Sequence, residues 1–549
     1  MSKSLKYLLW ALPLGFLLIY ILPLGVRPMV IPDEARYAEI PREMLESGNW
    51  IVPYLNGLRY FEKPVLGYWM NALSLSAFGE TAFAIRLPSA LAAGFSALLL
   101  FLLSLRFVGN RTVAALSAAI FLTCLEVFAV GVFSVLDSLF AFLVTASLVA
   151  FFFGIQSTGK EKQTYLALFG VACGLAFLTK GFLAFALPVI VIVPFMLWEG
   201  RWKELFTCGW LPMGAAFLTI LPWAWAVHLQ APDYWHYFFW EEHIKRFSSS
   251  TNAQHLQPFW FFIPVLLLGA LPWTSLVPQA VRGLWRDGLN TPLLRYALCW
   301  LILPFLFFSI SKGKLGTYIL PCFAPLAILL SVGLWQHFSQ HTEKRATWGD
   351  WLNIALAGVF GLALFIIQLF DFGVKAYTQS GEAWKWLLVL LSVGVWIGLT
   401  WSARNCTDPL QRLTRYVATP LAFMLSVHFA FPQQVEDSKA PDVFLRSVAA
   451  QISPQTLLVS DSSMVHAVAW AYKRKDIYML SHGELEYGLK YPDSEQRFLD
   501  EGKFKQFVAE NQGKRPIAII YRGDQFFYKN MLPANVKRFE QGKFFVLLF

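Results

Sequence analysis

Charge is scarce in this chain of 549 residues. Asp, Glu, Lys and Arg together make up only 15% of the sequence, whereas soluble domains carry about 25%. Hydrophobic residues account for 56% and aromatic residues for 17%, and the mean hydropathy is +0.50. This balance excludes an ordinary soluble domain and indicates an integral membrane protein.

Cysteine is equally sparse and is poorly placed for structural chemistry. No Cys-x-x-Cys occurs, and no cysteine falls within residues 32–64 or after Cys406. A disulfide framework and a thiolate zinc site are therefore not expected, and the redox compartment stays open. The six cysteines are Cys124, Cys173, Cys208, Cys299, Cys322 and Cys406.

Nucleotide and nucleic-acid motifs are also missing. The run Gly174–Lys180 approaches a phosphate-binding loop, but Thr179 stands where the second glycine belongs and no strand precedes it. We therefore expect no nucleotide cofactor. The net charge of +10 does not indicate a nucleic-acid partner, because most basic residues lie in short loops between apolar runs and no basic, aromatic-studded domain is present.

Long apolar runs are what the sequence does contain. They predict about 13 membrane-spanning helices over residues 1–431. The first follows Lys3 and Lys6 without a cleavage site, so we expect it to be retained. Residues 64–79 are too short to span and predict an interfacial or re-entrant helix. The expected spans are 7–26, 84–105, 112–132, 137–157, 164–180, 181–198, 207–229, 259–280, 293–311, 319–335, 351–371, 384–402 and 416–431.

The basic residues of alternate short loops predict the orientation. They place the N-terminus inside and the first loop, residues 27–83, outside the membrane. Residues 132–136, 230–258, 312–318 and everything after Phe431 are then also outside. The inner basic residues are Arg106, Arg111, Lys160, Lys162, Arg201, Lys203, Arg282, Arg286, Lys344, Arg345, Arg404 and Arg412.

Residues 432–549 change character and predict a small α/β domain outside the membrane. Strands are expected at 456–460, 516–521 and 543–549, and helices at 464–472 and 497–511. This region has no Gly-x-Gly-x-x-Gly and no evident catalytic cluster, which favours a supporting or substrate-guiding role.

The first loop is the most unusual stretch of the chain. Residues 32–64 read PDEARYAEIPREMLESGNWIVPYLNGLRYFEKP, with charges of both signs among tyrosines. A simple connection between two spans needs only a few polar turn residues. The composition therefore indicates a site at a membrane surface.

Other charged residues lie at the predicted outer ends of spans. Asp137 opens a span, where it is either a dipole-stabilising acid or an acid directed at the outer face. Lys180 closes one, where it either snorkels to the interface or serves a site. Lys312 and Lys314 occupy a short glycine-containing loop that suits phosphate binding, a mobile lid or a plain turn.

The segment 230–258 contains a candidate metal ligand. Glu241, Glu242 and His243 are adjacent, so a helix could not direct all three at one ion. A metal site would need a second contributor from another outer loop, and Glu62 is a suitable one. His243 could equally be an interfacial histidine.

Together these residues favour a phosphate-bearing lipid as the ligand. Lys and Arg can stabilise the negative charge of a departing phosphate, and carboxylates can orient or deprotonate an acceptor or hold a cation.

With an acidic pair after its first span, the chain resembles the GT-C class of lipid-dependent glycosyltransferases. The longer first-loop string, together with TKGFLA, DYWHYFFWEEHIKRF and SKGKLGTYILPCFAP, closely resembles the bacterial 4-amino-4-deoxy-L-arabinose transferases of lipid A. The resemblance runs through nearly all of the spanning region. In the C-terminal domain it rests on length and layout.

This resemblance implies an inverting enzyme of the Gram-negative inner membrane with a periplasmic active site. It would transfer aminoarabinose from undecaprenyl phosphate to lipid A and thereby confer polymyxin resistance. Asp33 is the implied catalytic carboxylate, with Arg36 and Tyr37 beside it, and Lys63 is implied at the carrier-lipid phosphate. Glu62 and His243 are the implied zinc pair, with Asp137, Lys180 and Tyr318 lining the cavity.

Two other classes remain open on the sequence. A sugar transferase acting on proteins would share the acidic first loop. A lipid transporter would also place charges near headgroups, but it should show inverted internal repeats, and none is convincing here. We expect a monomer with no nucleic-acid partner.

Overall fold

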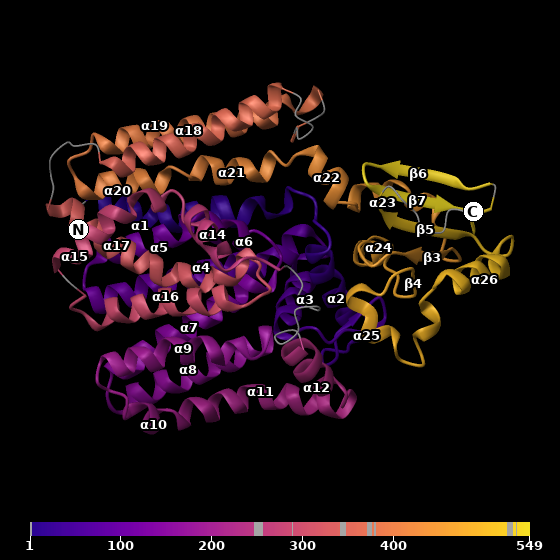
Figure 1. The fold of residues 1–549 in the computed structure, drawn as a ribbon, viewed down its shortest axis with the longest axis horizontal. Helices are drawn as coiled ribbons and strands as arrows, with labels where there is room; N and C mark the ends of the chain where they lie inside the picture. Colours follow the sequence, from indigo (N-terminus) through magenta and orange to yellow (C-terminus); the bar gives the residue numbers. More distant parts are fainter. Residues whose placement is uncertain are drawn as a thin grey trace.

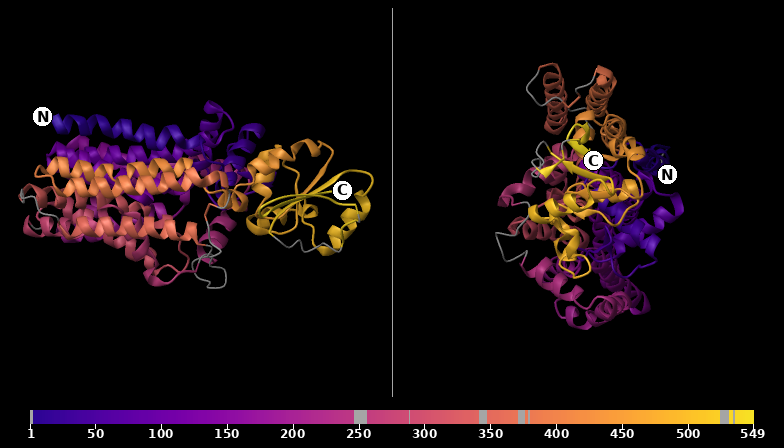
Figure 2. Two further views of the ribbon diagram at one scale, coloured as in Figure 1. Left: turned by 90° about the horizontal axis from the view of Figure 1, so that it is seen from above. Right: turned by 90° about the vertical axis from the view of Figure 1, so that its right-hand side faces the viewer.

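The computed structural model describes residues 3–245, 256–287, 289–340, 347–370, 376–377, 380–523, 531–533 and 535–549. The chain forms a bundle of roughly parallel and antiparallel helices, and a sheet-containing domain is attached to one end of it (Figure 1). The N-terminus lies at the opposite end of the bundle from this domain, as both Figure 1 and Figure 2 show.

Apolar helices dominate the bundle. In the described part of the chain, nine are long and apolar enough to cross a membrane, and eleven if two bent pairs each count as one span. The bundle helices are α1 Lys3–Phe16, α4 Ala82–Val108, α5 Arg111–Thr123, α6 Leu125–Gly131, α7 Leu136–Gln156, α8 Gly159–Lys180, α9 Leu183–Trp198, α10 Glu204–Cys208, α11 Trp210–Gln230, α14 Phe262–Gly269, α15 Val277–Asp287, α16 Pro292–Ile310, α17 Phe323–Gln340, α18 Trp348–Leu369, α19 Ala383–Arg404, α20 Pro409–Ala418 and α21 Leu421–Phe429.

The helical membrane fold predicted from the apolar runs is confirmed. By length and composition, however, fewer than the thirteen predicted spans qualify among the described residues. The two remaining predicted spans correspond to the short helix α9 and to the consecutive helices α20 and α21. The predicted division between two spans at Lys180-Gly181 is also confirmed. Gly181 has φ 77° and ψ −144°, a conformation that is essentially restricted to glycine, so α8 must end there.

The first loop is ordered into three elements at the end of the bundle. Helix α2, Asp33–Ser47, is followed by a hairpin of β1, Tyr54–Leu55, and β2, Leu58–Arg59, and then by α3, Leu66–Phe78. The hairpin turn is Asn56-Gly57, and both residues have positive φ, 55° and 66°. This is the two-residue turn that matches the twist of antiparallel strands. Helix α3 confirms the short helix expected at 64–79.

The C-terminal region contains a five-stranded mixed sheet in the order β4-β3-β5-β7-β6. Strand β3 pairs in parallel with β4 and β5, and β7 pairs antiparallel with β5 and β6. The three predicted strands and two predicted helices are present, whereas β4 and β6 were not predicted. The elements are α22 Gln433–Lys439, α23 Asp442–Ser447, β3 Leu457–Ser460, α24 Val465–Tyr472, β4 Tyr478–Met479, α25 Glu486–Leu489, α26 Glu501–Asn511, β5 Ile517–Arg522, β6 Lys537–Gln541 and β7 Phe544–Leu548.

Successive side chains of each strand point to opposite faces of the sheet, and this alternation explains how the domain is attached to the bundle. One set of side chains, including Val459 and Ile519, packs against α26 in a separate core. The other set, including Leu458 and Ile520, packs with α24 and is continuous with the core of the bundle. Because α24 packs directly on α2, the sheet is fixed against the first-loop helix.

Polar contacts reinforce this attachment at the hairpin turn. The Asn56 side chain donates to the Ile477 carbonyl at 2.9 Å and accepts from the Ile477 N–H at 3.0 Å. Arg497 donates to the Asn56 carbonyl at 2.7 Å. The tip of the hairpin is therefore joined to the edge of the C-terminal sheet.

Candidate active site

The two acidic residues that begin α2 have different roles. Glu34 is fully buried and forms a bidentate ion pair with Arg86 at 2.6 and 2.7 Å. It also accepts from the backbone N–H groups of Val30 and Ser134. All of its hydrogen-bonding capacity is used within the protein. Glu34 is thus a structural carboxylate that fixes the start of α2 against α4.

Asp33, by contrast, is available to a ligand. Its side chain is 46% exposed, and Arg36, one turn later, donates to it at 2.8 Å. The position at the first residue of α2 is favourable for a carboxylate because the helix dipole is positive there. The helical spacing of three residues accounts for the contact with Arg36.

The C-terminal domain contributes a carboxylate to the same cluster. Glu484, which precedes α25, lies 3.3 Å from Arg36 Nε. The Tyr60 hydroxyl accepts from Arg36 at 3.4 Å and lies 3.2 Å from both Glu484 and Glu62. We call Asp33, Arg36, Tyr60 and Glu484 the arginine cluster.

A buried histidine supports this cluster from α24. The His466 side chain is almost fully buried, and its Nε2 lies 3.7 Å from Glu484 Oε2. Neither ring nitrogen has a hydrogen-bond partner in the structure as described. His466 is therefore positioned as an electrostatic neighbour of Glu484, without a hydrogen bond that fixes its tautomer.

The electrostatics of the two carboxylates differ. Burial opposes ionisation of Glu484, but the positive charge of Arg36 and the neighbouring His466 outweigh it and hold the Glu484 pKa at about 2. Burial raises the pKa of Asp33, and the negative charge of Glu484 raises it further, against the opposing effect of Arg36. Glu484 is therefore ionised near neutral pH, whereas Asp33 titrates above its ordinary range.

A second group of predicted residues lies where α7, α8 and the segment before α17 meet. Lys180 donates to Asp137 at 2.6 Å, and its ammonium lies 4.7 Å from the centre of the Tyr318 ring. We call these three residues the lysine cluster. Asp137 and Tyr318 are 43 and 138 positions away from Lys180 in the sequence, and the fold brings the three residues together. That they line a substrate cavity stays a prediction.

The two clusters are close enough to influence each other. The charge of Asp137 contributes to raising the pKa values of both Asp33 and Tyr37. Tyr37 follows Arg36 in α2, with the Arg36 guanidinium 5.5 Å from its ring centre and the Tyr68 ring stacked on it at 5.9 Å between ring centres. One site at the end of the bundle thus contains carboxylates, cations and tyrosines from both clusters.

The remaining predicted residues lie beside the arginine cluster or in the loop before Tyr318. Glu62 contacts Tyr60, and Lys63 donates to the Glu62 carbonyl at 2.9 Å. Lys314 is buried, and its ammonium donates to the backbone carbonyls of Gln257, at 3.1 Å, and Ser311. Lys314 therefore stabilises its own loop, while Lys312 is exposed.

The expected zinc pair cannot be assembled from the described residues. Glu62 is described, but the side chain of His243 lies outside the part of the chain that the structure describes. Among described residues, no group of three or more His, Cys, Asp or Glu is placed to hold a metal ion. Zinc binding stays a prediction.

Comparison with known proteins identifies the family. A curated relative from Shewanella sediminis, named undecaprenyl phosphate-alpha-4-amino-4-deoxy-L-arabinose arabinosyl transferase, is 42% identical over 99% of this chain and 98% of its own. This chain belongs to that arabinosyl transferase family. A relative from Aeromonas salmonicida with the same name is 41% identical over 96% of each chain.

Family models and solved structures agree with the arabinosyl transferase family. A model described as dolichyl-phosphate-mannose-protein mannosyltransferase matches residues 5–238, and one described as arabinosyl transferase ArnT, C-terminal domain, matches residues 436–548. The crystal structure of ArnT from Cupriavidus metallidurans bound to undecaprenyl phosphate has a TM-score of 0.83 at 22% identity, covering 100% of this chain and 98% of that one. The fold is therefore shared.

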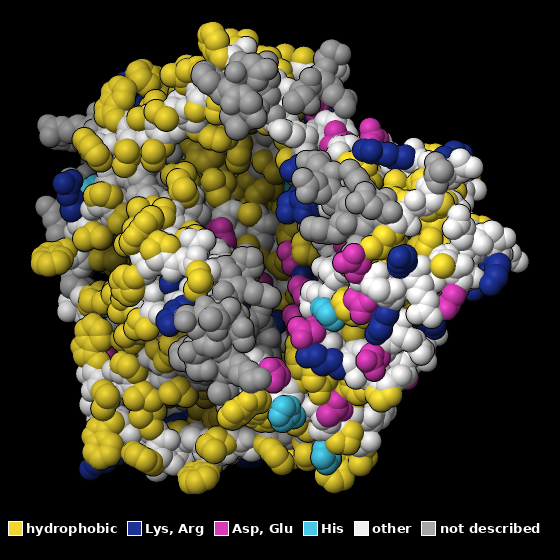
Figure 3. Space-filling model, turned by 45° about the vertical axis from the view of Figure 1, so that its right-hand side comes forward, with side chains coloured by type: hydrophobic (Ala, Val, Ile, Leu, Met, Phe, Trp, Pro, Cys, Tyr) yellow, Lys and Arg dark blue, Asp and Glu magenta, His cyan; other side chains and the backbone are white. Residues whose placement is uncertain are grey.

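Figure 3 shows how charge is distributed over one face of this arabinosyl transferase family member. Hydrophobic side chains cover the helical bundle, whereas acidic and basic side chains gather where the bundle meets the C-terminal domain, beside a hollow in the surface. The charged junction is also where the arginine cluster joins α2 to the C-terminal domain. An apolar body with one charged end suits a substrate that has a lipid tail and a polar head.

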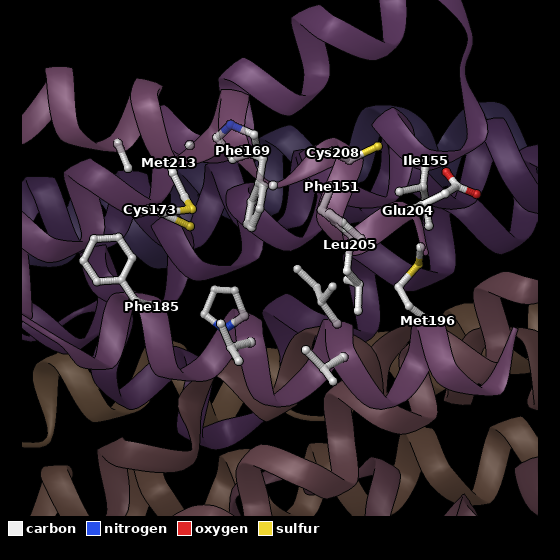
Figure 4. Close-up of a pocket in the computed structure, with 18 residues that line it drawn as sticks. Phe151, Ile155, Phe169, Cys173, Phe185, Met196, Glu204, Leu205, Cys208 and Met213 are labelled. Carbon is white, nitrogen blue, oxygen red and sulfur yellow. The ribbon is translucent and has the colours of Figure 1, made fainter. Parts of the chain in front are cut away.

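A separate cavity of about 310 Å³ lies among α7 to α11. Figure 4 shows its lining, including Phe151, Phe169, Phe185 and Met213, with Glu204 near one end. Glu204 pairs with Lys162 and Arg201, which were predicted to lie in inner loops. This cavity does not include residues of either charged cluster.

Sequence reasoning did not identify Glu484, Tyr60 or His466 as parts of the site. Tyr60 was noted only as one of the first-loop tyrosines. The Asn56-Gly57 pair was an available signal, because it predicts a hairpin whose second strand continues into Tyr60. No comparable signal links Glu484 or His466 to α2, since their proximity depends on how a separate domain is attached.

Proposed function

We propose that this chain transfers 4-amino-4-deoxy-L-arabinose from undecaprenyl phosphate to phosphate groups of lipid A. The proposal rests on the proximity of the arginine cluster to the lysine cluster, in a chain whose relatives are named for this donor. A lipid-linked phosphosugar requires an apolar surface for its tail and cations for its phosphate. The bundle and the clusters provide both.

The proposed reaction is a displacement at the sugar's anomeric carbon. An oxygen of the acceptor phosphate attacks this carbon, and the bond to the undecaprenyl phosphate oxygen breaks with its electron pair retained by that oxygen. The configuration is thereby inverted. A phosphodiester becomes a phosphate monoester, so negative charge grows on the leaving group, and we assign its stabilisation to Lys63, with Arg36 and Lys180 nearby.

Asp33 is proposed to orient the acceptor more than to remove a proton from it. The acceptor phosphate has a second pKa of about 6 and is largely ionised at neutral pH, so a strong base is not needed. The bond from Arg36 to Asp33 at 2.8 Å would hold the carboxylate in a fixed position. Arg36 could contact the acceptor phosphate at the same time, because its guanidinium has five donors.

We also propose a location for the chain and for its two domains. We propose a multi-pass protein of the Gram-negative inner membrane, with residues 1–431 as the catalytic membrane domain and 432–549 as a periplasmic domain. The last bundle helix ends at Phe429, and the C-terminal family model begins at residue 436. A monomer is proposed, because the arginine and lysine clusters are built from one chain.

Mass spectrometry of lipid A tests this function directly. A strain lacking the chain should gain an aminoarabinose-bearing lipid A when wild type is supplied, and it should survive higher polymyxin concentrations because a masked phosphate attracts cationic peptides less. Asp33→Asn is the matched inactive control. Unmodified lipid A in cells that contain wild-type protein and donor lipid would contradict the proposal.

One observation favours polypeptides as a second class of acceptor. The match of residues 5–238 to the mannosyltransferase family model includes the first loop, and proteins of that description act on polypeptides. Sugar appearing on a periplasmic protein, with lipid A unchanged, would support this alternative.

A further inference from the structure

A further carboxylate, that of Glu126, lies near the proposed site. Glu126 lies in the first turn of α6, immediately after the break that separates α5 from α6. The two helices are long enough to cross a membrane only together, and they are bent by 65° at this break. Interrupted helices within a membrane are tolerated where they line a cavity, and an ionisable residue there indicates function.

Two glycines from other elements accommodate the Glu126 side chain. A Cβ placed on Gly269, at the end of α14, would come within 2.7 Å of Glu126 Cβ. A Cβ placed on Gly316 would lie 3.8 Å from Glu126 Oε1. Gly316 begins the 3-10 segment that carries Tyr318, so the carboxylate is directed toward the loop that belongs to the lysine cluster.

Glu126 differs from the other carboxylates of the site in having no cation. Asp33 is bonded to Arg36, and Asp137 to Lys180. Within the described parts of the chain, Glu126 makes no hydrogen bond and no ion pair, and the charged group that acts on it is Asp137, which has the same sign. Its side chain is half-buried, so a small group can still reach it.

We propose that Glu126 binds the ammonium group of the donor sugar and so selects an amino sugar over a neutral one. The inference rests on the proposed function, which supplies a sugar with a primary amine at carbon 4. Such an amine is protonated at neutral pH, since the comparable lysine amine has a pKa of about 10.4. A cation would supply the missing partner for Glu126 and offset its repulsion with Asp137.

The position of Glu126 also fits the shape of the sugar. In a six-membered ring, carbon 4 is opposite the anomeric carbon. A residue that recognises the amine should therefore be separate from the residues at the reacting bond. Glu126 is on α6, next to the Tyr318 loop, whereas Asp33 and Lys63 belong to the first loop. The ring would lie between them.

Paired donors test this specificity. The full chain, reconstituted in lipid nanodiscs, is assayed with undecaprenyl phosphate–aminoarabinose and with the same lipid bearing L-arabinose, in which a hydroxyl replaces the amine. We expect Glu126→Gln to lower kcat/KM for the amino donor by about 10- to 100-fold, the range expected for a lost charged hydrogen bond. The value for the neutral donor should stay within about twofold. Glu126→Asp should retain part of the preference for the amino donor. Glu161→Gln is the control and should change neither value, because Glu161 is exposed and lies at the end of α8 away from Lys180.

The outcomes separate this inference from the proposed function. An equal loss with both donors would mean that Glu126 is structural and would overturn the inference while leaving the function intact. Unchanged kcat/KM for the amino donor would overturn it as well. Transfer from neither donor by wild-type protein would overturn the proposed function. In that case a binding assay with the amino lipid tests the inference separately. Equal affinity of wild type and Glu126→Gln would overturn it.

Discussion

At the scale of single residues, two adjacent carboxylates are expected to respond differently to the same substitution. Asp33 is half-exposed, and Arg36 is its one bonded partner among the described residues, so Asp33→Asn should reduce transfer by about 10²–10³ if it positions a charged transition state. The protein should remain folded. Transfer assays with reconstituted protein, together with a thermal unfolding profile, measure both properties.

Glu34→Gln should instead destabilise the protein. Removing one partner of a buried ion pair costs about 3–5 kcal/mol, because Arg86 would be left buried and uncompensated. The exposed pair of Glu80 with Lys473 is the matched control, and Glu80→Gln should cost less than about 1 kcal/mol. If Glu34→Gln unfolded at the wild-type temperature, the structural assignment of Glu34 would be wrong.

Glu34 should also make the stability of the fold depend on pH. Burial alone would raise the pKa of Glu34, but Arg86 outweighs this and the folded-state pKa is lowered. A lowered pKa stabilises the fold above the unfolded value of about 4.3 and the stabilisation is lost as pH falls through the folded value. Wild type should therefore lose stability in acid relative to Glu34→Gln, so that the gap between their unfolding temperatures narrows.

At the scale of elements, the segment around Glu484 extends the active site into the C-terminal domain. Glu484→Gln should lower kcat by about 10-fold, because Arg36 loses a charged partner at 3.3 Å. Since the negative charge of Glu484 raises the pKa of Asp33, the acid limb of the pH–rate profile should also move to lower pH. Glu486→Gln is the control, as Glu486 pairs only with Lys490 on the surface. A loss of activity with an unmoved acid limb would indicate a merely structural role.

The hairpin between β1 and β2 provides a test of how the C-terminal domain is attached. Gly57 and Gly48 both have positive φ, so alanine at either position costs about 1–2 kcal/mol in backbone strain. A Cβ on Gly57 would also lie 2.7 Å from the Lys475 carbonyl, whereas nothing lies within 4 Å of one on Gly48. Gly57→Ala should therefore be the more destabilising, measured by thermal unfolding. Equal effects would show that this contact does not hold the domain in place.

At the scale of the whole molecule, apolar length and loop charge were sufficient to predict the helical body. Even the division at Gly181 was predictable, because lysine and glycine interrupt the apolar run there. The extent of individual spans was less accessible, since bends such as that at Cys124 depend on neighbouring helices. The lysine cluster could be proposed from family resemblance, but its pairing of Lys180 with Asp137 required the fold.

The arginine cluster shows why part of the site was beyond sequence reasoning. Helical spacing suffices to connect Asp33 with Arg36. The acidic pair, however, gave no indication that Glu34 would be buried by Arg86, which is 52 positions away. Glu484 is farther still, and only the packing of α24 on α2 brings it to Arg36. Long-range contacts between a membrane body and an attached domain leave no periodic pattern in the sequence.

The orientation in the membrane can be tested on the full chain with a matched pair of cysteines. Lys503, in α26, and Lys160, in α8, are both exposed, and the predicted topology places them on opposite sides of the membrane. The native cysteines are buried except Cys208, so Cys208→Ser provides a quiet background. Lys503→Cys should react with an impermeant maleimide once the outer membrane is permeabilised, and Lys160→Cys only after the inner membrane is opened. The reverse pattern would place the clusters on the cytoplasmic side, where a periplasmic transfer reaction could not use them.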